Sequence, residues 1–160
     1  MALTTAQFAP GALYIAGFAQ ARAPHVGLII PFDEASGGLV HIRIDRATSP
    51  TWSYQYRVQR ITGDMFLTSL LQIRGAVPAA ITVEQLCQVA SSIPAPSNDV
   101  FGECSRWVMK VIQALNDEGL IQVTDIVALE QEFSDFVTGN RAYARRDRFP
   151  NVAVSAHCKV

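Results

Sequence analysis

The sequence predicts an α+β domain in which an antiparallel sheet comes first and helices packed beside it follow. The first half of the chain holds short segments that are rich in β-branched and aromatic residues and are separated by turn-forming residues. After residue 80, apolar residues recur every three or four positions, which is the spacing of one helical face. The 160 residues contain neither repeats nor a long linker, so we expect a single domain over residues 1–160.

Five strands are predicted in the first half of the chain. They are GALYIAGF (11–18), HVGLII (25–30), LVHIRI (39–44), SYQYRV (53–58) and FLTSLLQI (66–73). The segment PFDEASGG (31–38) predicts a hairpin connection in which Gly37 and Gly38 supply backbone freedom. The strands that carry histidine therefore occupy about residues 11–73.

Three helices are predicted in the second half, over about residues 82–139. The first spans 82–93 and starts at Thr82, and the second begins at Cys104 and ends at Gly119, where a left-handed cap is expected. The third, DIVALEQEFSDFVTG (125–139), starts at Asp125. Residues 140–160 form a tail in which NVAVSAH predicts a last short strand.

The composition argues against nucleic acid and a membrane as partners. A net charge of −1 with scattered basic residues offers no electrostatic footprint for nucleic acid. The N-terminal segment, residues 1–24, has neither the basic start of a signal peptide nor the uninterrupted apolar length of a membrane span. We therefore expect a cytoplasmic protein.

The three cysteines are an odd number without CxxC spacing. This pattern argues against a disulfide framework and suits a reducing compartment. Cys87 lies in the middle of a predicted helix and is expected to pack there. Cys158 is expected to be an exposed thiol in the tail.

Cys104 stands where the second helix begins, a position that serine, threonine or aspartate usually takes. One interpretation is that it packs as a small apolar residue beside the inward face formed by Val108, Val111 and Leu115. The other is that it is a nucleophile whose thiolate is stabilised by the unpaired amides and dipole of the helix, by about 0.3–1 kcal/mol.

Two of the three histidines lie on neighbouring predicted strands. His25 opens one strand and His41 lies inside the next. An imidazole beside a thiol can accept and return its proton, which is the chemistry of a Cys–His site. A simple hairpin through residues 35 and 36 would place His41 opposite about residue 29 and Asp45 opposite about His25. Asp45 is therefore an alternative residue to orient His25.

The order of these residues resembles a known thiol fold. HVGLII…GLVHIRI, followed by GECSRWV, is similar to the permuted NlpC/P60 (papain-like) fold, whose relatives include lecithin:retinol acyltransferase-like proteins and PPPDE peptidases. The resemblance covers roughly residues 11–120. It implies that His25 is the general base, His41 the polar third member and Cys104 the nucleophile.

The whole chain also resembles an uncharacterised fungal domain family. The similarity is carried by LYIAGF, DRATSPTW, the cysteine helix and RDRFPNVAVS. It implies no function.

The expected function is that of an intracellular cysteine-dependent hydrolase or acyl-transfer enzyme that acts on an amide, ester or thioester. Acyltransferase-like relatives carry asparagine before the cysteine, whereas here Glu103 would oppose thiolate formation. Two alternatives stay open: a catalytically silent binding module on the same fold, and a biosynthetic enzyme that uses the pocket for non-hydrolytic chemistry.

The expected partner is a small-molecule or peptide substrate, and the sequence predicts no cofactor. Cys104, His25, His41 and Cys158 could together supply four metal ligands, but they lack the local spacing of a zinc site, so no metal is expected. The sequence does not indicate an oligomeric state.

Overall fold

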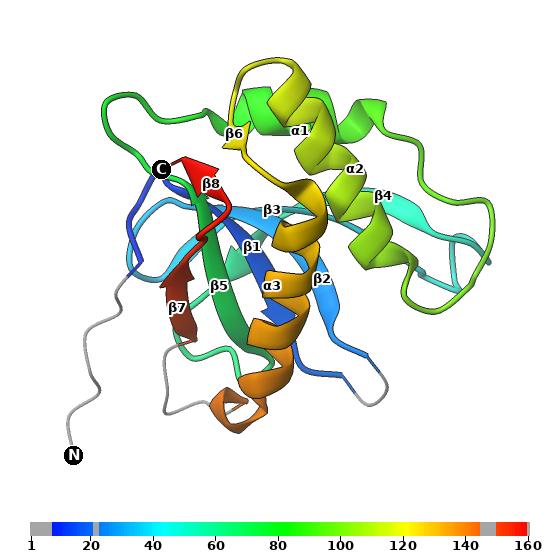
Figure 1. Cartoon of the computed structure of the whole chain (residues 1–160). Coiled ribbons are helices and arrows are strands. Elements are labelled where there is room, and N and C mark those ends of the chain that lie inside the picture. The colour runs from blue at the N-terminus through cyan, green and yellow to red at the C-terminus, as the bar shows by residue number, and fades with distance from the viewer. Residues whose placement is uncertain (1–7, 21–22, 145–149, 160) are drawn as a thin grey trace.

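The computed structural model describes residues 8–20, 23–144 and 150–159, and these form an α+β domain, which confirms the predicted class (Figure 1). In chain order the elements are β1 (Leu13–Phe18), β2 (His25–Pro31), β3 (Ser36–Arg43), β4 (Ser53–Arg60), β5 (Leu67–Arg74), α1 (Val83–Ser92), α2 (Glu103–Asp117), β6 (Gln122–Val123), α3 (Ile126–Gly139), the 3-10 turn η1 (Arg141–Tyr143), β7 (Asn151–Val154) and β8 (Cys158–Lys159). The N-terminal segment interpreted above lies partly outside the described residues.

Six strands form one sheet in the order β4-β3-β2-β1-β5-β7, and β6 pairs with β8 in a separate ladder. β1 to β5 pair antiparallel, as predicted, but β7 runs parallel to β5. Parallel pairing needs a long crossover. The three helices between β5 and β7 supply that crossover, so the sheet is mixed at one edge.

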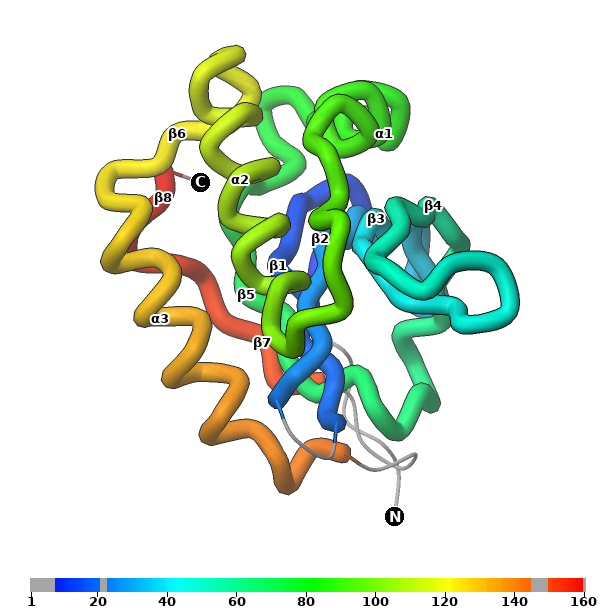
Figure 2. The backbone as a smooth tube through the Cα atoms, turned by 90° about the vertical axis from the view of Figure 1, so that its right-hand side faces the viewer, coloured from blue at the N-terminus to red at the C-terminus, as the bar shows by residue number. Residues whose placement is uncertain are grey.

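The three helices cover one side of the sheet, and Figure 2 shows α2 and α3 running along that side. Because strand side chains alternate between the two sides, the sheet contributes to two buried clusters. We call the first the helix side; it includes Leu13, Ile15, Val26, Leu28, Val40 and Ile42 from the sheet and Cys104, Trp107 and Val108 from α2. The second, the open side, includes Tyr14, Ala16, Phe18, Ile29 and Leu39, together with Ile61 from the connection between β4 and β5 and Leu67 from β5.

The β2–β3 hairpin has a register two positions away from the predicted one. Leu28 pairs with Val40, so His41 lies beside Gly27 and not opposite residue 29. The chain turns earlier than expected because the Asp33 carboxylate accepts the amides of Ala35 and Ser36, at 2.7 and 3.0 Å. Two glycines predicted in the connection, residues 37 and 38, therefore lie inside β3.

Gly37 lies where β3 and β2 approach each other closely. A Cβ on Gly37 would lie 2.6 Å from the carbonyl oxygen of Ile30, a distance that real Cβ atoms do not adopt. The strand pairing therefore requires this residue to be glycine for lack of space and not for turn freedom.

The tail contributes to the fold more than expected. β7 extends the main sheet, and β8 pairs with β6. Cys158 is only 9% exposed and belongs to the helix-side core, so the prediction of an exposed tail thiol is wrong. Across the described ranges, no helix is long and apolar enough to cross a membrane.

Candidate functional site

Three neighbouring strands each contribute one side chain to a hydrogen-bonded chain on the open side of the sheet. His25 Nε2 from β2 lies 2.7 Å from His41 Nδ1 on β3, and His41 Nε2 lies 2.8 Å from Gln55 Oε1 on β4. Strand pairing places Gln55 directly opposite His41. The backbone register therefore assembles this chain from residues far apart in sequence.

The donor and acceptor roles in these two hydrogen bonds follow from Gln55. The Gln55 oxygen can only accept a hydrogen bond, so the neutral His41 ring donates from Nε2 and accepts at Nδ1. His25 then donates from Nε2. The lone pair of neutral His25 consequently lies on Nδ1, the ring nitrogen nearer the backbone, where it is free to accept a proton.

Both imidazoles are neutral at neutral pH. Burial, followed by the charges of His41, Arg57 and Arg43, lowers the pKa of His25 to about 4. Burial also lowers the pKa of His41 to about 4, although its hydrogen bond to Gln55 acts in the opposite direction.

Two ring contacts fix the orientation of His25. Its ring meets that of His41 edge to face, with centroids 5.0 Å apart and planes at 74°. The Phe18 ring lies on another side, with a centroid distance of 5.8 Å. Phe18 pairs with His25 across β1 and β2 and belongs to the open-side cluster, which places the His25 ring on the open side.

Asp45 does not orient His25. β3 ends at Arg43, and the Asp45 carboxylate accepts the amide of Ala47 at 3.1 Å in the following turn. The prediction that Asp45 lies opposite His25 is wrong because the hairpin register differs by two positions. Gln55 is instead the residue that completes the chain beyond His41.

Cys104 is the second residue of α2, and its side chain packs in the helix-side core, 4% exposed. Burial raises the pKa of the Cys104 thiol, and the Glu103 carboxylate adds a smaller rise. The backbone amides of Val26, Ser105 and Cys104 itself act in the opposite direction by stabilising the thiolate. The helix start thus favours ionisation, as expected, but desolvation outweighs it.

Cys104 and His25 approach the start of β2 from the two sides of the sheet. The Val26 amide faces the sulfur, and Val26 directly follows His25 in the chain. The Val26 side chain, however, packs on the helix side, while the His25 ring lies with Phe18 on the open side. In the part of the chain that the structure describes, no hydrogen bond joins Cys104 to His25 or His41.

Two cavities flank this end of the sheet. One, of about 370 Å³, lies on the open side and is lined by Phe18, Ala19, Gln20, His25, Arg57, Asp64 and Phe66. The other, of about 220 Å³, lies on the helix side, and its lining includes Pro24, Val26, Gly102, Ser105 and Phe133. His25 lines the first cavity. Gly102 and Ser105, which precede and follow Cys104 in the chain, line the second.

The sequence analysis missed the polar residues of the open-side cavity. Arg57 donates to Gln59 Oε1 at 2.7 Å, and Gln59 Nε2 donates to Asp64 Oδ2 at 2.7 Å. The signal was available in the strand SYQYRVQR, where Gln55, Arg57 and Gln59 alternate with apolar residues and so share one side.

Within the described ranges, no group of three or more His, Cys, Asp or Glu side chains is arranged to hold a metal ion. His25 and His41 direct their facing nitrogens at each other. Cys158 lies beside Ser155 and Glu132 and not beside His25 or His41.

Comparison of the chain with protein-family models, curated proteins and solved structures finds no match.

Proposed function

We propose that this protein is a cysteine-dependent hydrolase or acyl-transfer enzyme of the permuted NlpC/P60 type, working in a reducing compartment such as the cytoplasm on an amide, ester or thioester. The observation that supports this most is the start of α2, where the backbone amides of Cys104 and Ser105 stabilise the Cys104 thiolate beside the helix-side cavity. The structure does not support His25 as the base for this thiol, because its ring lies on the open side of the sheet while Cys104 packs on the helix side.

In the free protein the thiol and the imidazole are both neutral, so the proton moves during attack. The Cys104 sulfur forms a bond to the substrate carbonyl carbon while its proton passes to a solvent water molecule in the helix-side cavity. The tetrahedral intermediate then collapses, the bond to the leaving group breaks, and the leaving group takes a proton from the hydronium ion so formed. Water or another nucleophile then attacks the acyl-Cys104 thioester and releases the acyl group.

The start of α2 supplies the groups that would stabilise the oxyanion. Its N-cap is Gly102, at φ 91°, and no side chain caps the first-turn amides. The amides of Cys104 and Ser105 face the sulfur and therefore lie close to the carbonyl carbon that it attacks. Donors fixed before the reaction stabilise the developing negative charge most effectively.

The test uses an activated ester, 4-nitrophenyl hexanoate. We expect a burst of nitrophenolate and an acyl group that peptide mass mapping locates on Cys104. Cys104→Ala should abolish both, and His25→Gln should leave acylation unchanged, because that ring lies on the other side of the sheet. Cys87→Ala is a second control, because it removes a different, partly buried thiol and should leave the burst unchanged. Acylation that persists in Cys104→Ala, or the absence of acylation in the wild type, would refute the proposal.

A binding module without turnover is the second candidate, and the burial of the thiol favours it. Cys104 is 4% exposed and its pKa is raised, so the free protein holds little thiolate at neutral pH. The same experiment separates the candidates, because a binding module takes up ligand beside His25 and leaves Cys104 unacylated.

A further inference from the structure

Arg57 places a positive charge beside His25, and no carboxylate among the described residues pairs with it. Its guanidinium lines the open-side cavity, and its hydrogen bond goes to the neutral Gln59 amide oxygen. Among the described residues, the one ion pair joins Arg106 to Glu103, on α2. An arginine aimed at a cavity with most of its five donors unused is suited to bind an anion.

Two arginines place positive charge near the imidazoles. Arg57 and Arg43 both lower the pKa of His25 and of His41, so their charges reach the two rings. Asp64 is the carboxylate that lines the cavity, and its hydrogen bonds fix its position while its negative charge remains. It accepts Gln59 Nε2 through one oxygen and the amides of Phe66 and Leu67 through the other.

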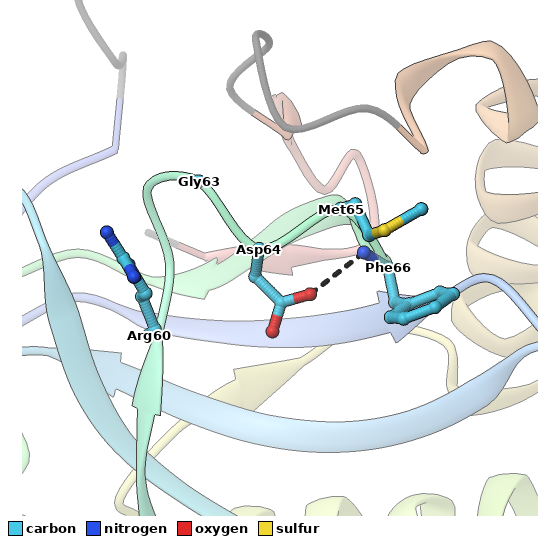
Figure 3. Close-up of a pocket in the computed structure, with 5 residues that line it drawn as sticks. All are labelled: Arg60, Gly63, Asp64, Met65 and Phe66. Carbon is cyan, nitrogen blue, oxygen red and sulfur yellow. Dashed lines mark hydrogen bonds between the residues drawn. The ribbon is translucent and has the colours of Figure 1, made fainter.

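An apolar surface adjoins the charge. Phe66 is 54% exposed, a high value for a large aromatic side chain, and it borders the cavity together with the buried Phe18. Figure 3 shows Asp64 and Phe66 on the loop that follows β4, joined by the hydrogen bond from the Phe66 amide. They also bound a wider hollow of about 600 Å³ that reaches Arg60.

We propose that the open-side cavity binds a ligand carrying a carboxylate next to an apolar chain, with the carboxylate held by Arg57 and the chain lying on Phe66. This ligand is distinct from the group that Cys104 would attack, because the open-side cavity and the thiol lie on opposite sides of the sheet, so the inference goes beyond the proposed function. Arg57 is the residue that determines which ligand binds.

A carboxylate fits the cavity better than a phosphate. The planar guanidinium of a single arginine matches the two oxygens of a carboxylate in a bidentate pair. A phosphate monoester carries about −1.5 to −2 charges at neutral pH. Asp64, fixed in the same lining, would repel that second charge.

The test compares hexanoate, hexanol and hexyl phosphate as probes of the full chain. Binding is followed through the NMR signals of the imidazole C–H groups. We expect hexanoate to bind more tightly than either other probe and to raise the pKa of His25, because an anion stabilises the protonated ring. Arg57→Gln should weaken hexanoate binding by roughly tenfold or more and leave hexanol binding unchanged.

Two further variants keep the test sharp. Arg57→Lys retains the charge but loses the planar fork, so it should recover only part of the affinity. Lys110→Gln removes one positive charge from an exposed position on α2 and should bind hexanoate as the wild type does. Equal affinity for hexanoate and hexanol, tighter binding of hexyl phosphate, or unchanged hexanoate binding in Arg57→Gln would overturn the inference.

Failure of this inference is distinguishable from failure of the proposed function. The binding measurement needs no turnover, so Arg57-dependent binding of hexanoate stands even if Cys104 is never acylated. Conversely, if Cys104 is acylated while the probes show no preference for a carboxylate, the enzyme proposal survives and the carboxylate site is refuted.

Discussion

The three helices begin in two different ways. α1 starts with a capping box in which the Thr82 side chain accepts the Gln85 amide and the Gln85 side chain accepts the Thr82 amide. α3 starts with Asp125, whose carboxylate accepts the Ala128 amide. α2 starts at Gly102 without a side-chain cap, and two of its first-turn amides face the Cys104 sulfur. The uncapped helix is the one whose first turn carries the candidate nucleophile.

Packing compensates α2 for the missing cap. Seven of its residues are buried, against three in each of the other two helices. Trp107 is 1% exposed, its indole donates to the Ile93 carbonyl at 3.1 Å, and its ring lies 6.0 Å from that of Tyr54. A helix anchored in this way can leave its first amides to a functional group, whereas α1 and α3 use theirs for stability.

The largest expected effect is therefore the loss of the α2 anchor. Trp107→Ala should lower the free energy of unfolding by about 3–5 kcal/mol, because it leaves a large cavity under the helix. Urea unfolding measures this change. Arg106→Ala, next in sequence but with a side chain 79% exposed, should change stability by less than about 0.5 kcal/mol. Comparable losses in both variants would contradict the idea that the buried face holds α2.

The pH dependence of stability tests the imidazole side of the site. The folded-state pKa of His25 and of His41 is about 4, below the ordinary value of 6.5. Between these values the unfolded chain binds more protons, so stability present above about pH 6.5 is lost as the pH falls towards 4. We expect a loss on the order of 2 kcal/mol for each of the two rings between pH 7 and pH 5 in urea unfolding.

His41→Gln should reduce this pH dependence, because it removes one of the two buried imidazoles. His157→Gln, at a histidine remote from the pair in sequence, serves as the control and should retain the wild-type profile. A flat profile in the wild type would show that folding does not lower the pKa values of the two rings.

Removal of a helix cap should lower the free energy of unfolding by a smaller amount. Thr82→Ala removes half of the capping box of α1 and should cost about 1 kcal/mol in urea unfolding. Its acylation by the ester should not change, because the cap lies on another helix. If Thr82→Ala alters acylation as strongly as stability, the division between capped and functional helix starts fails.

The smallest expected effect concerns the charge beside the thiol. Glu103 raises the pKa of Cys104, so Glu103→Gln should increase the rate of Cys104 alkylation by iodoacetamide at neutral pH by roughly two- to fivefold. Glu118→Gln, an exposed carboxylate at the other end of α2, is the control. A slower reaction in Glu103→Gln would contradict the assigned direction.

Local patterns predicted the elements well. The strand that opens at His25, the helix with Cys104 in its first turn and the helix starts at Thr82 and Asp125 all lie within a residue or two of their predicted positions. These features depend on periodicity and on residues adjacent in the chain, which the sequence displays directly.

The register of the hairpin was not predictable from periodicity. The pattern gives each strand its two sides but does not say where the turn closes. Asp33 closed it early, which removed Asp45 from consideration. The pairing of β3 with β4 separately brought Gln55 beside His41. Cys158 was misplaced for a related reason: its burial depends on β8 pairing with β6, a contact between distant segments.

The sequence by itself determined the α+β class, the two histidine-bearing strands and the helix that starts at a cysteine, because each follows from local spacing and composition. Only the tertiary structure decided how the functional groups meet. It joined His25 to His41 and Gln55, placed Arg57 beside that pair, and packed the Cys104 thiol on the other side of the sheet. These arrangements depend on strand register and on burial, which arise from contacts between distant parts of the chain.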